Sequence, residues 1–155
     1  MYGWGRVLST QPRTSKTEIE AHARSVFGFL EDPLVETTNT LERESHRSLL
    51  SYVVGDVFVE IELDWRESAV FILVGEAVDG HRPSGYYVDG AGRRVRWHLS
   101  AALQEGDYAE QVRNLTAVTK RSGRQAMLDQ IDAQSVSLRT ALPELPHLVQ
   151  QLQTR

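Results

Sequence analysis

Apolar and polar residues alternate almost without interruption between Asp56 and Arg66. One set of alternate positions carries Val57, Val59, Ile61, Leu63 and Trp65; the other carries Asp56, Glu60, Glu62, Asp64 and Arg66, with Phe58 as its apolar exception. Because successive strand side chains point to opposite faces of a sheet, this pattern predicts one long β-strand with an apolar face and an acidic face.

Further strands are predicted on both sides of this segment. Residues 34–43 are rich in Val and Thr, which suits a polar edge strand, and another strand is expected at 47–54. The continuous apolar run 69–74 is typical of a central strand that is buried on both faces. Segments 86–88 and 93–97 flank a glycine-rich turn and predict a hairpin. The connections are too short for parallel crossovers, so we expect an antiparallel sheet.

Helical periodicity precedes and follows these strands. Ser15 and Glu18 have the spacing of a capping box, and an apolar stripe then predicts a helix over 16–31. Similar stripes predict helices over 105–153, with a break near Gly123.

Together these elements predict an α+β fold. We expect a mostly antiparallel sheet of five or six strands, with an N-terminal helix and a helical C-terminal third packed on one face. The predicted layout is a single domain over 1–155, with a loose lead-in at 1–13, a helix at 16–31, the sheet at 34–98 and helices at 105–153. A chain of this length buries about two-thirds of its unfolded surface, so folding requires neither a disulfide nor a metal.

Composition excludes several chemistries. The chain has no cysteine, which rules out disulfides, thiolate metal sites and a cysteine nucleophile. Its net charge of −4 argues against general nucleic-acid binding, and no apolar run approaches the length of a membrane span. The first residues lack the apolar core of a signal peptide, so we expect a cytoplasmic protein of bacterial type.

The acids of the alternating strand and its flanking turns are the first candidate site, which we call the acidic row: Asp56, Glu60, Glu62, Asp64 and Glu67. It could pair with a basic protein surface, with Phe58 or Trp65 as an apolar anchor. It could hold a divalent cation or supply acid–base catalysis. It could also be a solvated sheet face whose acids pair with arginines of neighbouring strands.

The predicted hairpin supplies a second candidate site, for anion binding, formed by Arg93, Arg94, Arg96 and His98. Arg82 precedes it, and Tyr86, Tyr87 and Trp97 interleave aromatic rings with the charges. Basic and aromatic side chains together can bind phosphates and stack on bases. Alternation again offers a plainer interpretation, because these polar side chains could form an outer face that neutralises the acidic row.

No catalytic or metal-binding motif is recognised, and no cofactor is expected. The leading hypothesis is therefore a non-catalytic protein-binding module of immunity, inhibitor or adaptor type, whose acidic row meets a basic partner protein. One alternative is a carboxylate- or metal-dependent enzyme acting on a phosphate-bearing substrate. Another is an assembly subunit that self-associates through its helical C-terminal third. Neither nucleic acid nor a membrane is expected as a partner.

Overall fold

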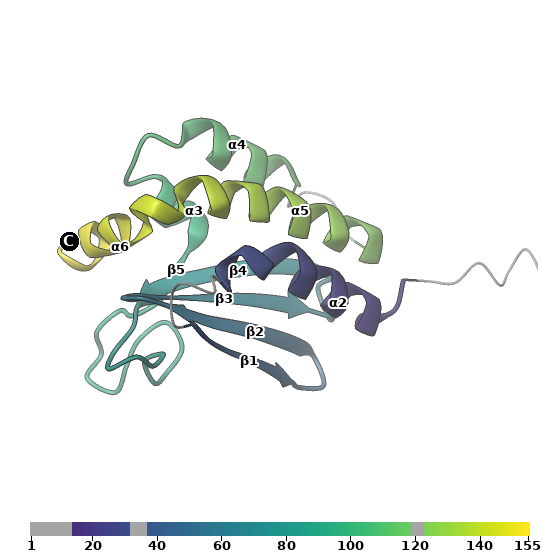
Figure 1. The fold of residues 1–155 in the computed structure, drawn as a ribbon, viewed down its shortest axis with the longest axis horizontal. Coiled ribbons are helices and arrows are strands. Elements are labelled where there is room, and N and C mark those ends of the chain that lie inside the picture. Colours follow the sequence, from purple (N-terminus) through teal and green to yellow (C-terminus); the bar gives the residue numbers. More distant parts are fainter. Residues whose placement is uncertain (1–13, 32–36, 119–122) are drawn as a thin grey trace, which may run out of the picture.

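Four long strands and one short strand form an antiparallel sheet in which chain order and spatial order coincide (Figure 1). The computed structural model describes residues 14–31, 37–118 and 123–155. The strands are β1 (Thr37–Arg43), β2 (Arg47–Val54), β3 (Val57–Asp64), β4 (Ala69–Glu76) and β5 (Trp97–His98). The alternating segment is thus a strand as predicted, and short turns place each long strand beside the preceding one.

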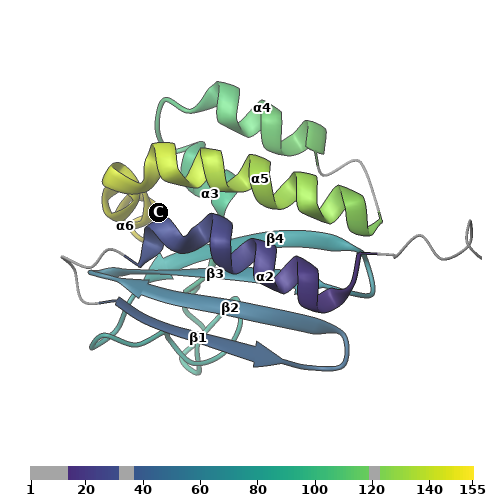
Figure 2. The ribbon, with the colours of Figure 1, turned by 45° about the vertical axis from the view of Figure 1, so that its right-hand side comes forward.

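The helices all lie on one side of the sheet (Figures 1 and 2). They are α2 (Lys16–Val26) with the 3-10 turn η1 (Phe27–Leu30), α3 (Leu99–Leu103), α4 (Ala109–Val118), α5 (Arg124–Ala141), the 3-10 turn η2 (Leu142–Glu144) and α6 (Leu145–Gln153). Helices α2 and α5 run side by side across the sheet, and α4 lies on the outer side of α5. The predicted α+β class, with helices from both ends of the chain on one face, is confirmed.

Two helices begin where the sequence predicts, and each begins directly after its N-cap residue. Ser15 is the N-cap of α2, and its hydroxyl accepts the Glu18 N–H at 3.1 Å as the capping-box spacing predicted. Helix α5 likewise begins directly after Gly123. The predicted lead-in at 1–13, and the beginning of the strand predicted at 34–43, lie outside the described residues.

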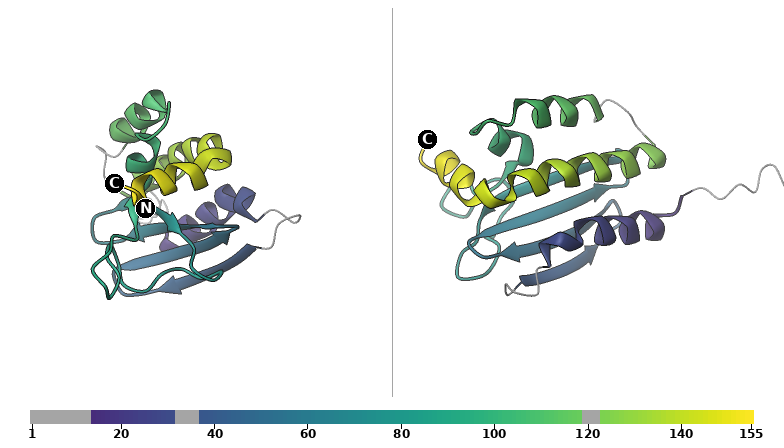
Figure 3. Two further views of the ribbon diagram at one scale, coloured as in Figure 1. Left: turned by 90° about the vertical axis from the view of Figure 1, so that its left-hand side faces the viewer. Right: turned by 45° about the horizontal axis from the view of Figure 1, so that its top comes forward.

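The predicted hairpin at 86–97 forms only in part. One isolated bridge joins Val88 to Arg94, and only Trp97 and His98 pair with β4. Most of the segment between β4 and β5 is instead an irregular connection of residues 77–96, which we call the crossing loop. It lies against the sheet face opposite the helices (Figure 3).

The core lies between the sheet and the helices. Val59 and Ile61 of β3 are fully buried there against Ile19 and Phe27 of the first helical segment. Burying each large apolar side chain of this kind contributes about 1.5–3 kcal/mol. The same side of β3 carries Val57 and Leu63, so the apolar half of the alternating pattern faces the helices as expected.

The other half of that pattern faces the crossing loop. Strand register aligns Ser51 with Glu60 and Leu49 with Glu62, so these side chains share the loop-side face of the sheet. In the ranges 14–31, 37–118 and 123–155, none of the helices has the length and apolar character needed to cross a bilayer.

Candidate functional site

Arg96 fastens the crossing loop to the sheet. Its Nε and Nη2 donate to the two carboxylate oxygens of Glu60 at 2.7 and 3.1 Å. The remaining N–H groups donate to the backbone carbonyls of Pro83, Gly85 and Tyr86 at 2.9–3.0 Å. All five guanidinium donors are therefore satisfied inside the protein, which is the condition for burying a charged pair.

A second arginine extends this network across the loop-side face. Arg82 donates to Glu60 at 2.8 Å and to Glu42 of β1 at 3.3 Å. Glu62 is held separately, by Arg47 of β2 and by the Tyr86 hydroxyl. Each of the two central acids of β3 consequently has a partner in the same chain.

The acidic row is thus not a free acidic surface at its centre. Glu60 is 2 % exposed and Glu62 is 8 % exposed, and Phe58 is fully buried with the Arg96 guanidinium 5.1 Å above its ring. The sequence hypothesis placed these side chains toward a partner protein. The crossing loop covers them instead. Arginines of the loop pair with Glu60, and Arg47 of β2 pairs with Glu62, in line with the plainer interpretation of the two charge patterns.

The remaining members of the predicted protein-binding site lie apart from one another. Asp56 and Glu67 are exposed in the turns at opposite ends of β3. Asp64 accepts the backbone N–H groups of Arg66 and Glu67, so it closes a turn. Trp65 belongs to the helix side, where its indole N–H donates to the Ser48 hydroxyl at 3.1 Å. These residues do not form one continuous surface.

The predicted anion-binding residues also separate. Arg96 is buried, whereas Arg93 and Arg94 are exposed and line a cleft beside α6. His98 is half-buried on the loop side, where its Nε2 is 3.0 Å from the Tyr87 hydroxyl. Burial lowers the pKa of His98, and the nearby Arg94 charge lowers it further.

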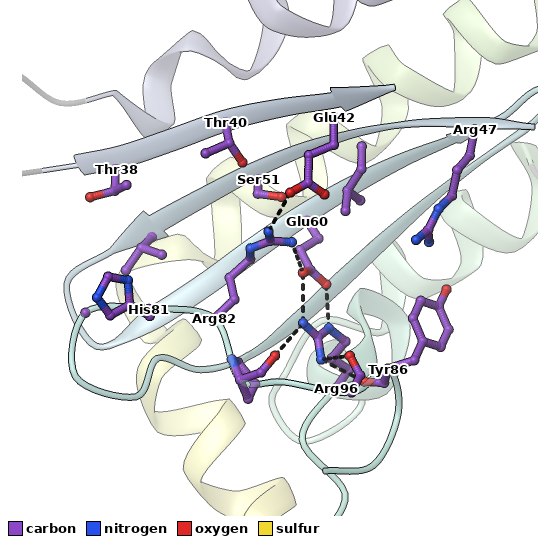
Figure 4. Close-up of a pocket in the computed structure, with 15 residues that line it drawn as sticks. Thr38, Thr40, Glu42, Arg47, Ser51, Glu60, His81, Arg82, Tyr86 and Arg96 are labelled. Atoms are coloured by element: carbon purple, nitrogen blue, oxygen red, sulfur yellow. Dashed lines mark hydrogen bonds and ion pairs between the residues drawn. The ribbon is translucent and has the colours of Figure 1, made fainter. Parts of the chain in front are cut away.

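A groove of about 470 Å³ opens on the loop-side face between β1, β2 and the crossing loop (Figure 4). We call it the loop-side groove. Thr38, Thr40 and Glu42 of β1 line one wall, and the crossing loop forms the other with His81, Arg82 and Tyr86. Arg47, Leu49, Ser51 and Val53 of β2 contribute to the floor, together with Glu60 and Arg96. Pockets of this volume hold ligands of several hundred daltons or a short stretch of polypeptide.

Ser51 is the unusual member of this lining. Its side chain is buried, with the residue 3 % exposed, yet its hydroxyl oxygen has no hydrogen-bond partner among the described residues. A buried hydroxyl without a partner costs about 1–3 kcal/mol, so native proteins rarely leave one. The groove therefore contains a donor and acceptor whose partner is not supplied by the described part of the chain.

At one end of the groove, Arg47 stays charged and the Tyr86 phenol stays protonated at neutral pH. Hydrogen bonds to Glu44 and Glu62 raise the pKa of Arg47, and burial together with the Glu62 carboxylate raises the pKa of Tyr86. This end of the groove accordingly holds a cation and a phenol, both of which donate to Glu62. Glu42 and Glu60 supply the opposite charge, so the lining carries both signs.

Sequence reasoning missed most of this groove. The sequence pattern places Thr38 and Thr40 only in a polar edge strand, and it indicates no binding role for the residues of β2. Their two-residue spacing was a usable signal, because it places Thr38 with Thr40 and Leu49 with Ser51 on common faces. Nothing local in the sequence shows that the crossing loop forms the second wall.

No three His, Asp or Glu side chains of the described residues come together in a way that could hold a metal ion. Comparisons with known proteins add no constraint. No family model matches the chain, and neither the curated proteins nor the solved structures contain a significant match to it.

Proposed function

We propose that this protein is a non-catalytic binding module that holds an extended segment of another protein in the loop-side groove. The observation that carries the proposal is the buried Ser51 hydroxyl, which lines the groove and has no partner among the described residues. The oxygen itself is buried, so a bound chain reaches it when the lining side chains move apart. A backbone amide of that chain then supplies the missing hydrogen bond, since it offers both a donor and an acceptor.

The spacing of the lining supports a polypeptide as the occupant. Thr38 and Thr40 on one wall, and Leu49, Ser51 and Val53 beneath them, repeat every second residue along antiparallel strands. That repeat is about 7 Å, which equals the side-chain repeat of an extended chain lying along the strands. Hydroxyl, apolar and charged positions alternate in the lining, as in surfaces that recognise both the backbone and the side chains of a peptide.

This proposal does not rest on the acidic row, on which the sequence hypothesis was based. Glu60 and Glu62 have arginine partners in the same chain, so a basic partner gains nothing from them without breaking those pairs. A partner defined by positive charge alone is therefore not favoured. Immunity, inhibitor and adaptor roles, and a location in a bacterial cytoplasm, remain predictions from the sequence.

Two matched variants test the groove. Peptides that bind the protein are first selected from a random library, and their affinities are measured by fluorescence anisotropy. Thr40→Trp fills the groove from an exposed position of β1, and we expect the affinity to fall at least tenfold. Asn39→Trp adds the same bulk at the next exposed residue, on the opposite face of the same strand, and should leave the affinity within about twofold.

Ser51→Ala should weaken peptide binding without lowering the stability of the fold. Because the hydroxyl has no partner in the described residues, its removal should leave the free energy of unfolding unchanged or raise it slightly. Loss of one hydrogen bond to the peptide should weaken binding by about 0.5–1.5 kcal/mol, or roughly two- to tenfold. Equal peptide affinities for wild type, Thr40→Trp and Ser51→Ala would exclude this groove as the binding site.

A further inference from the structure

A second cavity, which we call the hairpin cleft, is lined by Arg93, Arg94 and Arg155. It has a volume of about 640 Å³ and lies between the crossing loop, the ends of β4 and β5, and the end of α6. Its lining shares only Pro83 with the loop-side groove. The two sites are therefore distinct, and the hairpin cleft is not used by the proposed protein-binding function.

Arg94 is held in a fixed orientation in this cleft. Its guanidinium carbon is 5.6 Å from the centre of the Tyr87 ring and 5.9 Å from the centre of the Trp97 ring. Its Nε donates to the backbone carbonyl of Arg96 at 3.1 Å. Among residues 14–31, 37–118 and 123–155, no group accepts a hydrogen bond from its two Nη nitrogens. The cleft thus contains an oriented pair of donors that carries a positive charge.

Two further guanidinium groups lie in the same lining, and that of Arg93 is only weakly engaged. The Arg93 side chain is 80 % exposed and contacts Asp89 at 3.4 Å, and the exposed Arg155 pairs with Glu105. A loose pair with an exposed cation, such as that of Arg93, contributes about 0–1 kcal/mol, so Arg93 can turn toward a ligand at little cost. Arg155 is held more firmly, at 2.6 Å from a carboxylate whose side chain is only 8 % exposed. Glu76 is the one acid in the lining, which leaves an excess of positive charge.

Apart from Gln153, the remaining lining is apolar. Val78, Pro83, Val95, Trp97 and Leu152 contribute to the walls. Val78 is 52 % exposed, which is high for a large aliphatic side chain beside a cavity. A ligand that fills the cleft therefore gains from an apolar body as well as from negative charge.

We propose that the hairpin cleft binds an oxyanion group, a carboxylate or a phosphomonoester, that is carried on an apolar or aromatic body. The Nη groups of Arg94 match the two oxygens of such a group, because a guanidinium presents parallel N–H donors in one plane. The apolar walls receive the body of the ligand. Glu76 opposes negative groups beyond the one that Arg94 binds, which disfavours polyphosphates and nucleic-acid backbones.

Isothermal titration calorimetry with four small probes tests this assignment. The probes are 1-naphthyl phosphate, 1-naphthoate, the neutral 1-naphthol and inorganic phosphate. We expect at least one naphthyl oxyanion to bind at least tenfold more tightly than both naphthol and inorganic phosphate. Whichever of the two oxyanions binds more tightly identifies the phosphate or carboxylate source. Equal binding of naphthol would overturn the role of the charge, and equal binding of inorganic phosphate would overturn the role of the apolar walls.

Matched variants locate the bound probe. Arg94→Gln should weaken the naphthyl oxyanion at least tenfold, whereas Arg113→Gln, the same charge change at an exposed position of α4, should leave its affinity unchanged. If Arg94→Gln lowers the melting temperature, Arg93→Gln and the NMR shift of the Trp97 indole N–H provide the second measurement. Wild-type affinity in both Arg94→Gln and Arg93→Gln, or a Trp97 resonance that does not shift when the probe is added, would refute the proposal. Neither result would bear on the loop-side groove.

Discussion

Arg96 and Glu60 form the pair on which the crossing loop depends. The arginine joins three backbone carbonyls of the loop to one carboxylate of the sheet, and both side chains are nearly inaccessible to water. A buried pair of this kind adds little net stability over an apolar pair, but removing one partner leaves the other charge without compensation. Its contribution here is therefore to define one position for an irregular segment.

Arg96→Leu should destabilise the protein by about 2–4 kcal/mol, because three loop carbonyls lose their donor and Glu60 keeps only its pair with Arg82. Urea unfolding at neutral pH measures this loss. Arg93→Leu is the control, since that side chain is 80 % exposed, and its effect should stay within about 0.5 kcal/mol. A loss below about 1 kcal/mol for Arg96→Leu would mean that the loop is held by other contacts.

Gly75 of β4 is a position where a side chain cannot be accommodated. A Cβ atom there would lie 2.3 Å from the Val95 carbonyl oxygen and 2.4 Å from the Phe58 ring. Gly75→Ala should therefore cost at least about 2 kcal/mol, because backbone and a buried ring must both move. Gly28→Ala is the matched control, since nothing lies within 4 Å of the Cβ atom that it adds. Its melting temperature, measured by calorimetry, should stay near that of the wild type.

The lowered pKa of His98 predicts a pH dependence of stability. The folded state binds the proton less readily than the unfolded chain, whose His titrates near 6.5. The contribution of His98 is thus complete above about pH 6.5 and is lost as the pH falls through its lower folded pKa. The free energy of unfolding is therefore compared at about pH 7.5 and about pH 5.5, on the two sides of the unfolded value. In His98→Gln the decrease in urea midpoint over that interval should be smaller; an identical decrease would exclude His98 as a source.

At the scale of the elements, two glutamines of α5 take the place of a missing strand. The short β5 pairs only with Leu73 and Val74, so it leaves Val70 without a strand partner on that side. Gln130 accepts the Val70 N–H at 2.8 Å, and Gln134 donates to the Val70 carbonyl at 2.8 Å. Both amides are buried, and they connect the helix to the backbone of the sheet.

Gln134→Leu should lower the free energy of unfolding by about 1–3 kcal/mol, because the buried Val70 carbonyl then loses its donor. The exposed Gln125 on the first turn of the same helix provides the control, and Gln125→Leu should change stability by less than about 0.5 kcal/mol. Chemical denaturation of both variants checks the comparison. Similar stabilities would show that water can replace the glutamine at this edge.

The elements themselves were largely predictable because local patterns determine them. The alternation from Val57 onward predicted β3, and the Ser15–Glu18 spacing predicted where α2 begins. The hairpin prediction was less accurate, because alternation near Arg94 and Arg96 resembles a strand in a segment where only two residues pair with the sheet. Residues 99–103 were not predicted as a helix, and such a short helix carries too few residues for a clear period.

At the scale of the whole molecule, the site depends on contacts that no local pattern contains. Glu60 and Arg96 are 36 residues apart, and each alone resembles the solvent-facing half of an amphipathic strand. Only their juxtaposition reveals that the polar faces are turned toward each other. The prediction of fold class could therefore succeed while the prediction of a free acidic surface did not hold at its centre.

The two borders of the sheet differ in how they can receive another chain. At one border β5 is only two residues long, and glutamine amides occupy the backbone groups of Val70 next to it; within the described ranges no strand lies beside the outer edge of β1. The long β1 edge is consequently the better place for another chain to extend the sheet. Two copies joined along that edge would leave the short, partly occupied borders outside, which favours a closed pair over a fibre.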